Sequence, residues 1–384
     1  GMHMDIGALF DRPRLFALGF CWIAVHALIM LALAKLIRAP LFFMAVGSQA
    51  NIGGAASAPV VASAFHPTLA PVGVLMAVVG YAAGTYCAYL TGLMLQAMAG
   101  HDPKDSTSSI LSVGNYIEAL EQDVKGLRIG LSPDYEAVYY PDLESGELHT
   151  EPIQKEVHDA VLYAAEILAK AGAEIIENVP LPNTRYGIPT YFVISRVEAA
   201  SNLHRFDGVK YGYRTSENVA DLNELYRRSR AEGFGLEPKL RILMGMYVSA
   251  AEHASDYYQK ALKVRSMIRG DFDQAFDPQG SYRLDALLTP TTATTAFKRK
   301  AVYGNSVLMQ YSDQMTVASN HAGVPALTMP GGLDQNGLPI GIQLIGNDFR
   351  EELILRIGHA YERLTTDDAW RNVCPQVLQG EVKA

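Results

Sequence analysis

Charged side chains are missing from one long stretch of this 384-residue chain, because residues 39–101 contain no Asp, Glu, Lys or Arg. The surface of an ordinary soluble domain cannot be built without charge over such a length. Only two acidic and four basic residues precede Asp102, so the first part carries a net charge of +2 and the rest −10. This change of composition predicts two domains, residues 1–95 and residues 96–384.

Cysteines and blocks of basic residues are also scarce. The three cysteines (Cys21, Cys87 and Cys374) lie far apart and show neither a disulfide framework nor a metal-binding spacing. This favours a reducing compartment, so we expect residues 96–384 to be cytoplasmic. We also expect no cofactor in this chain. The acidic second part lacks a basic block, which argues against direct nucleic acid binding because phosphate neutralisation needs clustered Lys and Arg.

The apolar first part contains two candidate membrane spans. Residues 15–34 carry no charge, and at ~1.5 Å per residue they would reach ~30 Å, the thickness of a hydrocarbon core. The second candidate lies within residues 69–98, where a glycine pair with small-xxx-small spacing suits helix contact in lipid or in a protein core. Residues 46–59, between the two candidates, contain Gly, Asn and Pro and would break a helix. The two interpretations of this break are a transport site and a re-entrant turn. The sequence therefore predicts an all-α membrane-like segment.

Residues 10–92 resemble the end of a family of multi-spanning membrane proteins, the domain of unknown function 819. The motifs that carry the resemblance are LIRAPLF at 36–42, GSQANIGG at 47–54 and APVVA at 58–62. The resemblance implies membrane contact through residues 15–98 and membrane association through the first 95 residues. Most spans of that family would lie upstream, so a working transporter is not expected.

Helix and strand patterns alternate after Gly100 and predict a layered α/β domain. The Ser-rich residues 106–109 are expected to cap the next helix. Strands are expected at residues 125–131, 175–176, 285–290, 324–332 and 340–345, the last two joined by a hairpin at Asn336-Gly337. Helices are expected at residues 151–171, opened by Pro152 and stopped by Gly172, and near 190–203, 220–232, 237–252, 253–275 and 350–364.

Residues 95–384 resemble the amidase signature enzymes, and most closely the A subunits of bacterial glutamyl-tRNA(Gln)/aspartyl-tRNA(Asn) amidotransferases. The motifs are MAGHDPKDSTS at 98–108, EAASNLHRFDGVKYGYR at 198–214, RILMG at 241–245, LTPT at 288–291, NHAGVPA at 320–326 and GLPIGIQ at 337–343. The resemblance implies part of an amidase-signature fold, a mixed β-sheet covered by helices. It also implies release of ammonia from glutamine, and B and C partner subunits, of which the B subunit uses ATP and Mg.

Amide hydrolysis needs an activated nucleophile, a base and donors for the oxyanion. The amidase signature family uses a Ser nucleophile, a second bridging Ser and a Lys base, all in its first half. The nearest local text, residues 53–58, lacks the paired serines. Asp285, beside a predicted strand, is expected to be a loop residue. No residue is therefore assigned a catalytic role, and we expect the chain alone to have no glutaminase activity.

Two residues are candidates for holding the substrate. By motif match, Arg241 would bind the α-carboxylate of glutamine through its two-pronged guanidinium group. Asp313 would accept the α-ammonium group. Without the resemblance, each would be interpreted as a member of a surface ion pair. Four further polar residues belong to the resembling phrase without an assigned role: Asn202, Asp207, Tyr211 and Tyr213.

Three interpretations of the whole chain stay open. The first is a glutaminase subunit by descent that lacks its catalytic residues. The second is a membrane-tethered, non-enzymatic binding protein. The third is an accidental join of two unrelated genes near residues 91–98, with no function of its own. The first residues, Gly-Met-His-Met, suggest an expression scar or a fragment of a longer reading frame.

Overall fold

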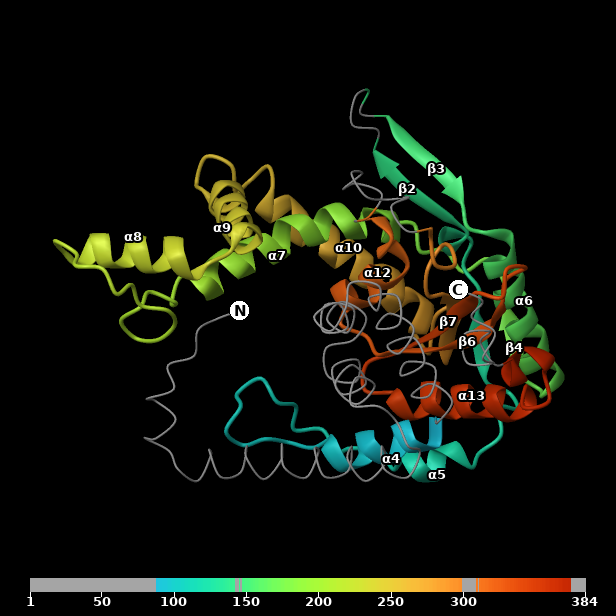
Figure 1. Ribbon diagram of the computed structural model, residues 1–384. Helices are drawn as coiled ribbons and strands as arrows, with labels where there is room; N and C mark the ends of the chain where they lie inside the picture. Colours follow the sequence, from blue (N-terminus) through green and yellow to red (C-terminus); the bar gives the residue numbers. More distant parts are fainter. Residues whose placement is uncertain (1–87, 142–144, 146, 299–308, 310, 374–384) are drawn as a thin grey trace, which may run out of the picture. The chain divides into compact units, whose positions relative to one another are not determined.

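The computed structural model describes residues 88–141, 145, 147–298, 309 and 311–373 (Figure 1). They fall into two compact units. The sheet unit comprises the described parts of Gly84–Phe192 and Gln259–Ala384, and the helical unit comprises Val193–Tyr258. The predicted break at 46–59 and the first candidate span lie outside the described residues. Within the described residues, no helix combines the length and the apolar character needed to cross a membrane.

A five-stranded mixed sheet forms the centre of the sheet unit, in the order β4-β1-β5-β7-β6. β1 (Arg128–Gly130) pairs in parallel with β4 (Glu174–Ile176) and with β5 (Ala286–Pro290). β7 (Pro339–Gly346) pairs in antiparallel fashion with β5 and with β6 (Ala326–Leu333). All five predicted strands are present, and the predicted α/β class with a mixed sheet covered by helices is confirmed.

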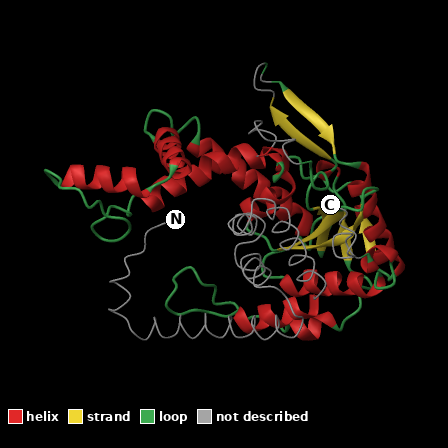
Figure 2. Cartoon of the chain, in the orientation of Figure 1, coloured by secondary structure: helices red, strands yellow, loops and turns green. Residues whose placement is uncertain are grey.

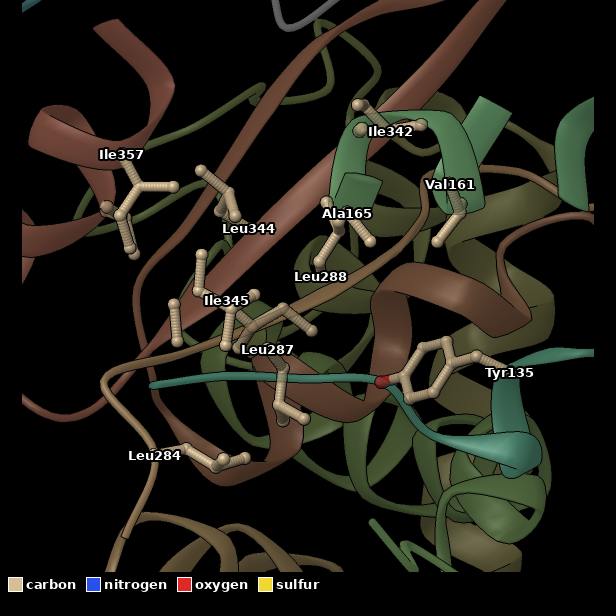
Figure 3. Packing of buried hydrophobic residues seen from close by; sticks show 14 of the residues in the cluster. Tyr135, Val161, Ala165, Leu284, Leu287, Leu288, Ile342, Leu344, Ile345 and Ile357 are labelled. Atoms are coloured by element: carbon tan, nitrogen blue, oxygen red, sulfur yellow. The ribbon is translucent and has the colours of Figure 1, made fainter. Parts of the chain in front are cut away.

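Helices cover both faces of this sheet (Figure 2). α6 (Lys155–Lys170) and α13 (Glu351–Leu364) contact β6 and β7 on one face. α10 (Tyr258–Phe276) and α12 (Gln314–Ala322) cover the other face. Figure 3 shows Leu288, Ile342 and Leu344 of the sheet beside side chains of α6 and α13. Burying each such side chain contributes about 1.5–3 kcal/mol.

Helix α6 follows the expected apolar periodicity but begins later than its sequence predicted. Its buried residues recur at three- and four-residue spacings and form one stripe toward the core: Val157, Ala160, Val161, Ala164, Ala165 and Leu168. Gly172, with φ of +99°, follows the helix end as expected. Pro152 does not open the helix, because it ends strand β3 (Leu148–Pro152). β3 pairs with β2 (Ala137–Pro141) in an antiparallel hairpin that the sequence did not predict.

The predicted hairpin at Asn336-Gly337 joins β6 and β7 through a five-residue loop, residues 334–338. The Asp334 carboxylate accepts the backbone N–H groups of Asn336 and Leu338, each at 2.8 Å. These bonds hold the pKa of Asp334 below its usual value. Gly337 supplies the positive φ of +75° that the turn requires.

The Ser-rich residues 106–109 do not cap a helix, contrary to expectation. The next helix, α5 (Tyr116–Leu120), is capped by Asn115, whose side chain accepts the Glu118 N–H at 3.2 Å. Ser108 instead accepts the backbone N–H of Asp102 at 2.9 Å, within a loop. The correct cap lies directly before the helix, where a side-chain oxygen can reach the first free N–H groups. α4 (Ala88–Met98) precedes this loop.

The helical unit contains most of α7 (Gly187–Leu203), together with α8 (Leu222–Gly233) and α9 (Leu236–Ser249), close to the expected positions. α9 packs directly on the backbone of α7 at Gly245. A Cβ atom at Gly245 would collide with the carbonyl group of Arg196 and lie 2.8 Å from the Ala200 Cβ. Short 3₁₀ helices complete the described chain: η3 (Pro133–Tyr135), η4 (Thr184–Tyr186) and η5 (Ala369–Asn372).

Candidate functional site

Asp313 lies at the N-cap position of α12 in the sheet unit. Its backbone carbonyl accepts the N–H groups of Thr316 and Val317, each at 3.1 Å. Its side chain makes no capping hydrogen bond and is exposed. The carboxylate has no hydrogen bond or ion pair to any described residue, so its charge is available to a cationic ligand.

Two buried glutamine side chains fix the first turn of α12. The Gln343 Nε2 on β7 donates to the carbonyl oxygens of Met315, at 2.7 Å, and Pro290, at 3.1 Å. The Gln314 Oε1 accepts the backbone N–H of Tyr139, at 3.0 Å. The start of α12 is therefore tied to β5, β7 and β2, and Asp313 is held beside the carboxyl end of β5.

Aromatic rings lie close to this helix start. The ring centroids of Tyr311 and Tyr140 are 6.3 Å apart, and Tyr140 also stacks on His149, at 5.6 Å. Burial raises the pKa of Tyr311, so its hydroxyl stays protonated over a wide pH range. An exposed carboxylate near aromatic faces is an arrangement that binds organic cations.

The end of β5 also carries hydroxyl groups available for hydrogen bonding. Thr289 pairs with Gln343 across the sheet, and Thr291 follows directly after the strand. The hydroxyl oxygens of both are buried and lack a hydrogen-bond partner among the described residues. A buried hydroxyl without a partner is costly, so these groups can be satisfied by water or by a bound polar ligand.

Arg241, the second predicted substrate residue, lies on α9 in the helical unit and Asp313 lies in the sheet unit. The Arg241 Nε donates to the Glu237 Oε1, one turn earlier, at 3.0 Å. The two side chains are 37 % and 64 % exposed, which makes this a surface pair of low strength.

The resembling phrase at residues 198–214 forms the end of α7 and a loop held by internal hydrogen bonds. The guanidinium group of Arg230 on α8 donates to the carbonyl oxygens of Leu203, His204 and Phe206. The Asp207 carboxylate accepts the backbone N–H groups of Val209, at 2.8 Å, and Lys210, at 3.0 Å, which lowers its pKa. Among the four residues without a role, these contacts explain Asp207 as a loop-forming residue.

Sequence reasoning identified Asp285 correctly as a loop residue, but it did not single out the two buried glutamines. Asp285 lies directly before β5, and its carboxylate accepts the backbone N–H of Arg128 at 2.8 Å. Gln314 and Gln343 were not singled out, although a Gln inside the apolar run at residues 340–345 was a visible signal. In the described part of the chain, no group of three or more His, Cys, Asp or Glu side chains could hold a metal ion.

Known proteins match both parts of the chain. The family described as Amidase matches residues 69–355, and the family described as Protein of unknown function (DUF819) matches residues 1–98. Both resemblances seen in the sequence are therefore confirmed, and the two matches overlap at residues 69–98.

Several similar proteins are named as the A subunit of glutamyl-tRNA(Gln) amidotransferase. That of Carboxydothermus hydrogenoformans is 44 % identical over 273 residues, covering 71 % of this chain and 52 % of the relative. That of Brevibacillus brevis is 46 % identical over 270 residues, covering 70 % and 51 %. The chain thus spans about half the length of the curated relatives that it matches.

Solved structures support the same fold. The crystal structure of the Thermotoga maritima relative of the same name has a TM-score of 0.50 and 28 % identity, covering 70 % of this chain and 49 % of that one. A bacterial aryl acylamidase of the amidase signature family has a TM-score of 0.52 at 20 % identity, which shows the fold alone. Because the Amidase family matches most of its length, at residues 69–355, the chain belongs to the amidase family.

Proposed function

We propose that this chain is the substrate-holding half of a glutamine amidohydrolase, the ammonia-supplying subunit of a tRNA-dependent amidotransferase. The observation that carries the proposal is the exposed Asp313 carboxylate, without a partner among the described residues, at the fixed start of α12. Relatives at 44 % and 46 % identity are named as A subunits of glutamyl-tRNA(Gln) amidotransferase. The resemblance of residues 95–384 to that family implies glutamine as the substrate.

Each of the two residues has a proposed role of its own, Asp313 in the sheet unit and Arg241 in the helical unit. Asp313 would accept the α-ammonium group, and Arg241 would form two parallel hydrogen bonds with the α-carboxylate. Arg241 would first leave Glu237, and an exposed pair of this spacing stabilises a helix by only about 0.3–0.5 kcal/mol. The ion pair with Glu237 is therefore only a weak restraint on Arg241.

Hydrolysis would convert glutamine and water to glutamate and ammonia. The family's Ser nucleophile, bridging Ser and Lys base have no counterpart that we can assign in this sequence. The proposed role is thus to bind glutamine, without hydrolysing it alone. In the complete system, B and C subunits would be the partners, and ATP and Mg would act in the B subunit.

Isothermal titration of the purified full chain with glutamine tests this role. We expect Arg241→Ala and Asp313→Asn each to weaken glutamine binding at least tenfold, with no ammonia release by any form. Arg228→Ala is the matched control, because Arg228 on α8 makes the same i,i+4 pair with Glu224, at 2.9 Å. Equal binding by all variants would reject the assigned residues, and ammonia release abolished by Arg241→Ala would reject the inactivity.

A membrane-tethered binding protein is the second candidate function, favoured by the DUF819 match at residues 1–98. It requires that the expressed chain partition into membranes and resist a carbonate wash. Recovery of the chain in the supernatant would reject it. An amplicon from source DNA across the codons for residues 60–130 tests whether the fusion is genuine, because two separate genes would give no product.

A further inference from the structure

Strands β2 and β3 form a two-stranded sheet that projects from the body of the sheet unit (Figure 1). All residues of β3 are exposed, whereas those of β2 are partly buried. The outer edge of β2 is occupied, because the Tyr139 N–H donates to the Gln314 side chain at 3.0 Å. No described strand pairs with the outer edge of β3. An open edge strand is a template for a further strand.

The hydrogen bonds of the hairpin show which backbone groups of β3 face outward. The Ile153 N–H donates to the Glu136 carbonyl at 3.0 Å, so Ile153 faces the side of β2. Residues that face the neighbouring strand alternate with residues that face away along an antiparallel ladder. Leu148, Thr150 and Pro152 therefore direct their backbone groups away from β2. No described residue outside the hairpin forms a hydrogen bond with the backbone of Leu148 or Thr150.

The two side chains that flank Thr150 are a base and an acid. His149 and Glu151 lie on the same face of the hairpin, because side chains alternate between the faces of a strand. Tyr140 on β2 contacts both of them. Its ring stacks on His149, with centroids 5.6 Å apart, and its hydroxyl donates to the Glu151 carboxylate. The base and the acid are therefore held on one face by a common neighbour.

We propose that two copies of this chain pair through the outer edges of their β3 strands, antiparallel about a two-fold axis at Thr150. His149 of each copy then lies opposite the partner's Glu151. Side chains directly opposite each other have Cβ atoms about 4.5–5.5 Å apart, so the imidazole can donate to the carboxylate. A symmetric dimer makes this contact twice. This pairing does not depend on the proposed role in glutamine binding.

The charges select this register. Two-fold axes through His149, Thr150 or Glu151 would each bring outward backbone groups of the two strands together. An axis through His149 places the two imidazoles opposite each other, and an axis through Glu151 does the same with two carboxylates. Like charges directly opposite each other are destabilising. The axis at Thr150 is the one of the three that sets a base opposite an acid.

The edge suits a second copy better than an unrelated strand. Proline and charged side chains on an edge strand oppose pairing with other strands, and Pro152 lacks an N–H group. In the symmetric pair, the Pro152 carbonyl accepts the N–H of the partner's Leu148, and the charges are matched. Thr150 contributes the two hydrogen bonds of a closely spaced pair. These few bonds make a small interface, so the dimer should form in a concentration-dependent way.

Cysteine cross-linking of the purified full chain tests the register. Opposed residues in a hydrogen-bonded pair have Cα atoms about 5.5 Å apart, within the range of about 4.4–6.8 Å that a disulfide spans. In air-saturated buffer, we expect Thr150→Cys to give at least tenfold more disulfide-linked dimer than His149→Cys or Glu151→Cys. The unchanged chain, with its three cysteines, measures the background.

A charge swap supplies the matched control. His149→Glu alone places carboxylates opposite each other and should weaken dimerisation at least tenfold in sedimentation equilibrium. His149→Glu combined with Glu151→His keeps the composition of the parent and restores opposite partners, so it should recover dimerisation. Equal melting temperatures of the single and double variants would show that both fold.

The other outcomes would overturn the proposal. Monomers at every concentration would exclude the pairing, and preferred cross-linking through residue 149 or 151 would exclude the register. Dimers that the single charge change leaves intact would assign self-association to another surface. Slow hydrogen exchange of the Thr150 amide in the monomer would show that another segment of the same chain covers this edge.

Discussion

The side-chain amide of Gln343 on β7 donates to the backbone carbonyl of Met315 in α12 at 2.7 Å. The same amide also donates to Pro290 at the end of β5, and the Gln343 side chain is 1 % exposed. One buried residue therefore satisfies two carbonyl groups from separate elements. The position of Asp313, two residues before Met315, depends on this contact.

We expect Gln343→Leu to destabilise the sheet unit, because it leaves the Met315 and Pro290 carbonyls without their donor. The cost of an unsatisfied buried carbonyl is about 1–3 kcal/mol. Urea unfolding of the variant and of the parent measures the change. Gln335→Leu, in the exposed hairpin loop, is the control with the same substitution and should change stability by less than about 0.5 kcal/mol. An unchanged midpoint for Gln343→Leu would contradict the anchoring role.

His321 predicts how stability depends on pH. It is 9 % exposed, its Nε2 donates to the Gly187 carbonyl at 2.9 Å, and burial lowers its pKa below the ordinary 6.5. The unfolded chain therefore takes up a proton on this ring at a higher pH than the folded chain. Stability from His321 is fully present above pH 6.5 and is lost as the pH falls through the folded pKa.

The measurement compares the free energy of unfolding of the parent and His321→Gln between pH 7.5 and 5. We expect the parent to lose more stability than the variant as pH falls below 6.5. The amide of Gln can donate to the Gly187 carbonyl at every pH, so it serves as a non-titrating replacement. Parallel pH profiles for the two proteins would show that His321 makes no such contribution.

Replacing Gly245 by alanine should create a packing defect in the helical unit. Gly245→Ala would place a methyl group against the Arg196 carbonyl, which belongs to backbone and cannot move aside as a flexible side chain can. We expect α9 to separate from α7, at a cost of about 1–3 kcal/mol for overpacking. Hydrogen exchange of α9 amides would report this as faster exchange.

Gly270→Ala is the matched control, because Gly270 lies within α10 and a Cβ atom there meets nothing within 4 Å. Alanine at an open helix position is favoured over glycine by about 0.5–1 kcal/mol, so this variant should be more stable than the parent. If both glycine variants gain stability, the close α7–α9 contact is not as described.

Arg269 links α10 to the end of α12 and to the loop that follows β7. Its guanidinium nitrogens donate to both carboxylate oxygens of Asp348, at 3.0 and 2.6 Å, and to the Ala322 carbonyl, at 2.8 Å. Arg269→Lys cannot reproduce this two-pronged geometry. Because the pair is about one-third exposed, we expect a loss of only about 1 kcal/mol in urea unfolding. Arg228→Lys, in the α8 pair that uses the single nitrogen Nε, should have a smaller effect than Arg269→Lys.

The elements that the sequence predicted well are those with a strong local pattern. Helix α6 has an apolar stripe, β5 is a short and mostly apolar run ended by a proline, and the β6–β7 hairpin has Gly337 in its turn. The β2–β3 hairpin was missed because its strands show no buried alternation. Helix α12 was missed because polar and apolar residues alternate there without a clear helical period.

Some residues of the candidate site were predicted from the sequence, and others were found only in the structure. Arg241 and Asp313 were selected from motif resemblance, and their substrate roles stay predictions. Gln314, Gln343 and the two threonine hydroxyls at the end of β5 became visible only in the folded chain. Their role depends on partners far away in sequence; Gln343 and Met315, for example, are 28 positions apart.

The sequence by itself determined the change from an apolar to a charged part, the alternation of helices and strands, and the membership in the amidase family. Each depends on composition or on short motifs, which are local properties. The tertiary structure decided the strand order, the exposed edge of β3 and the anchoring of α12. These result from pairing between distant segments, where hydrogen bonds and burial select one register and one neighbour among several that local patterns allow.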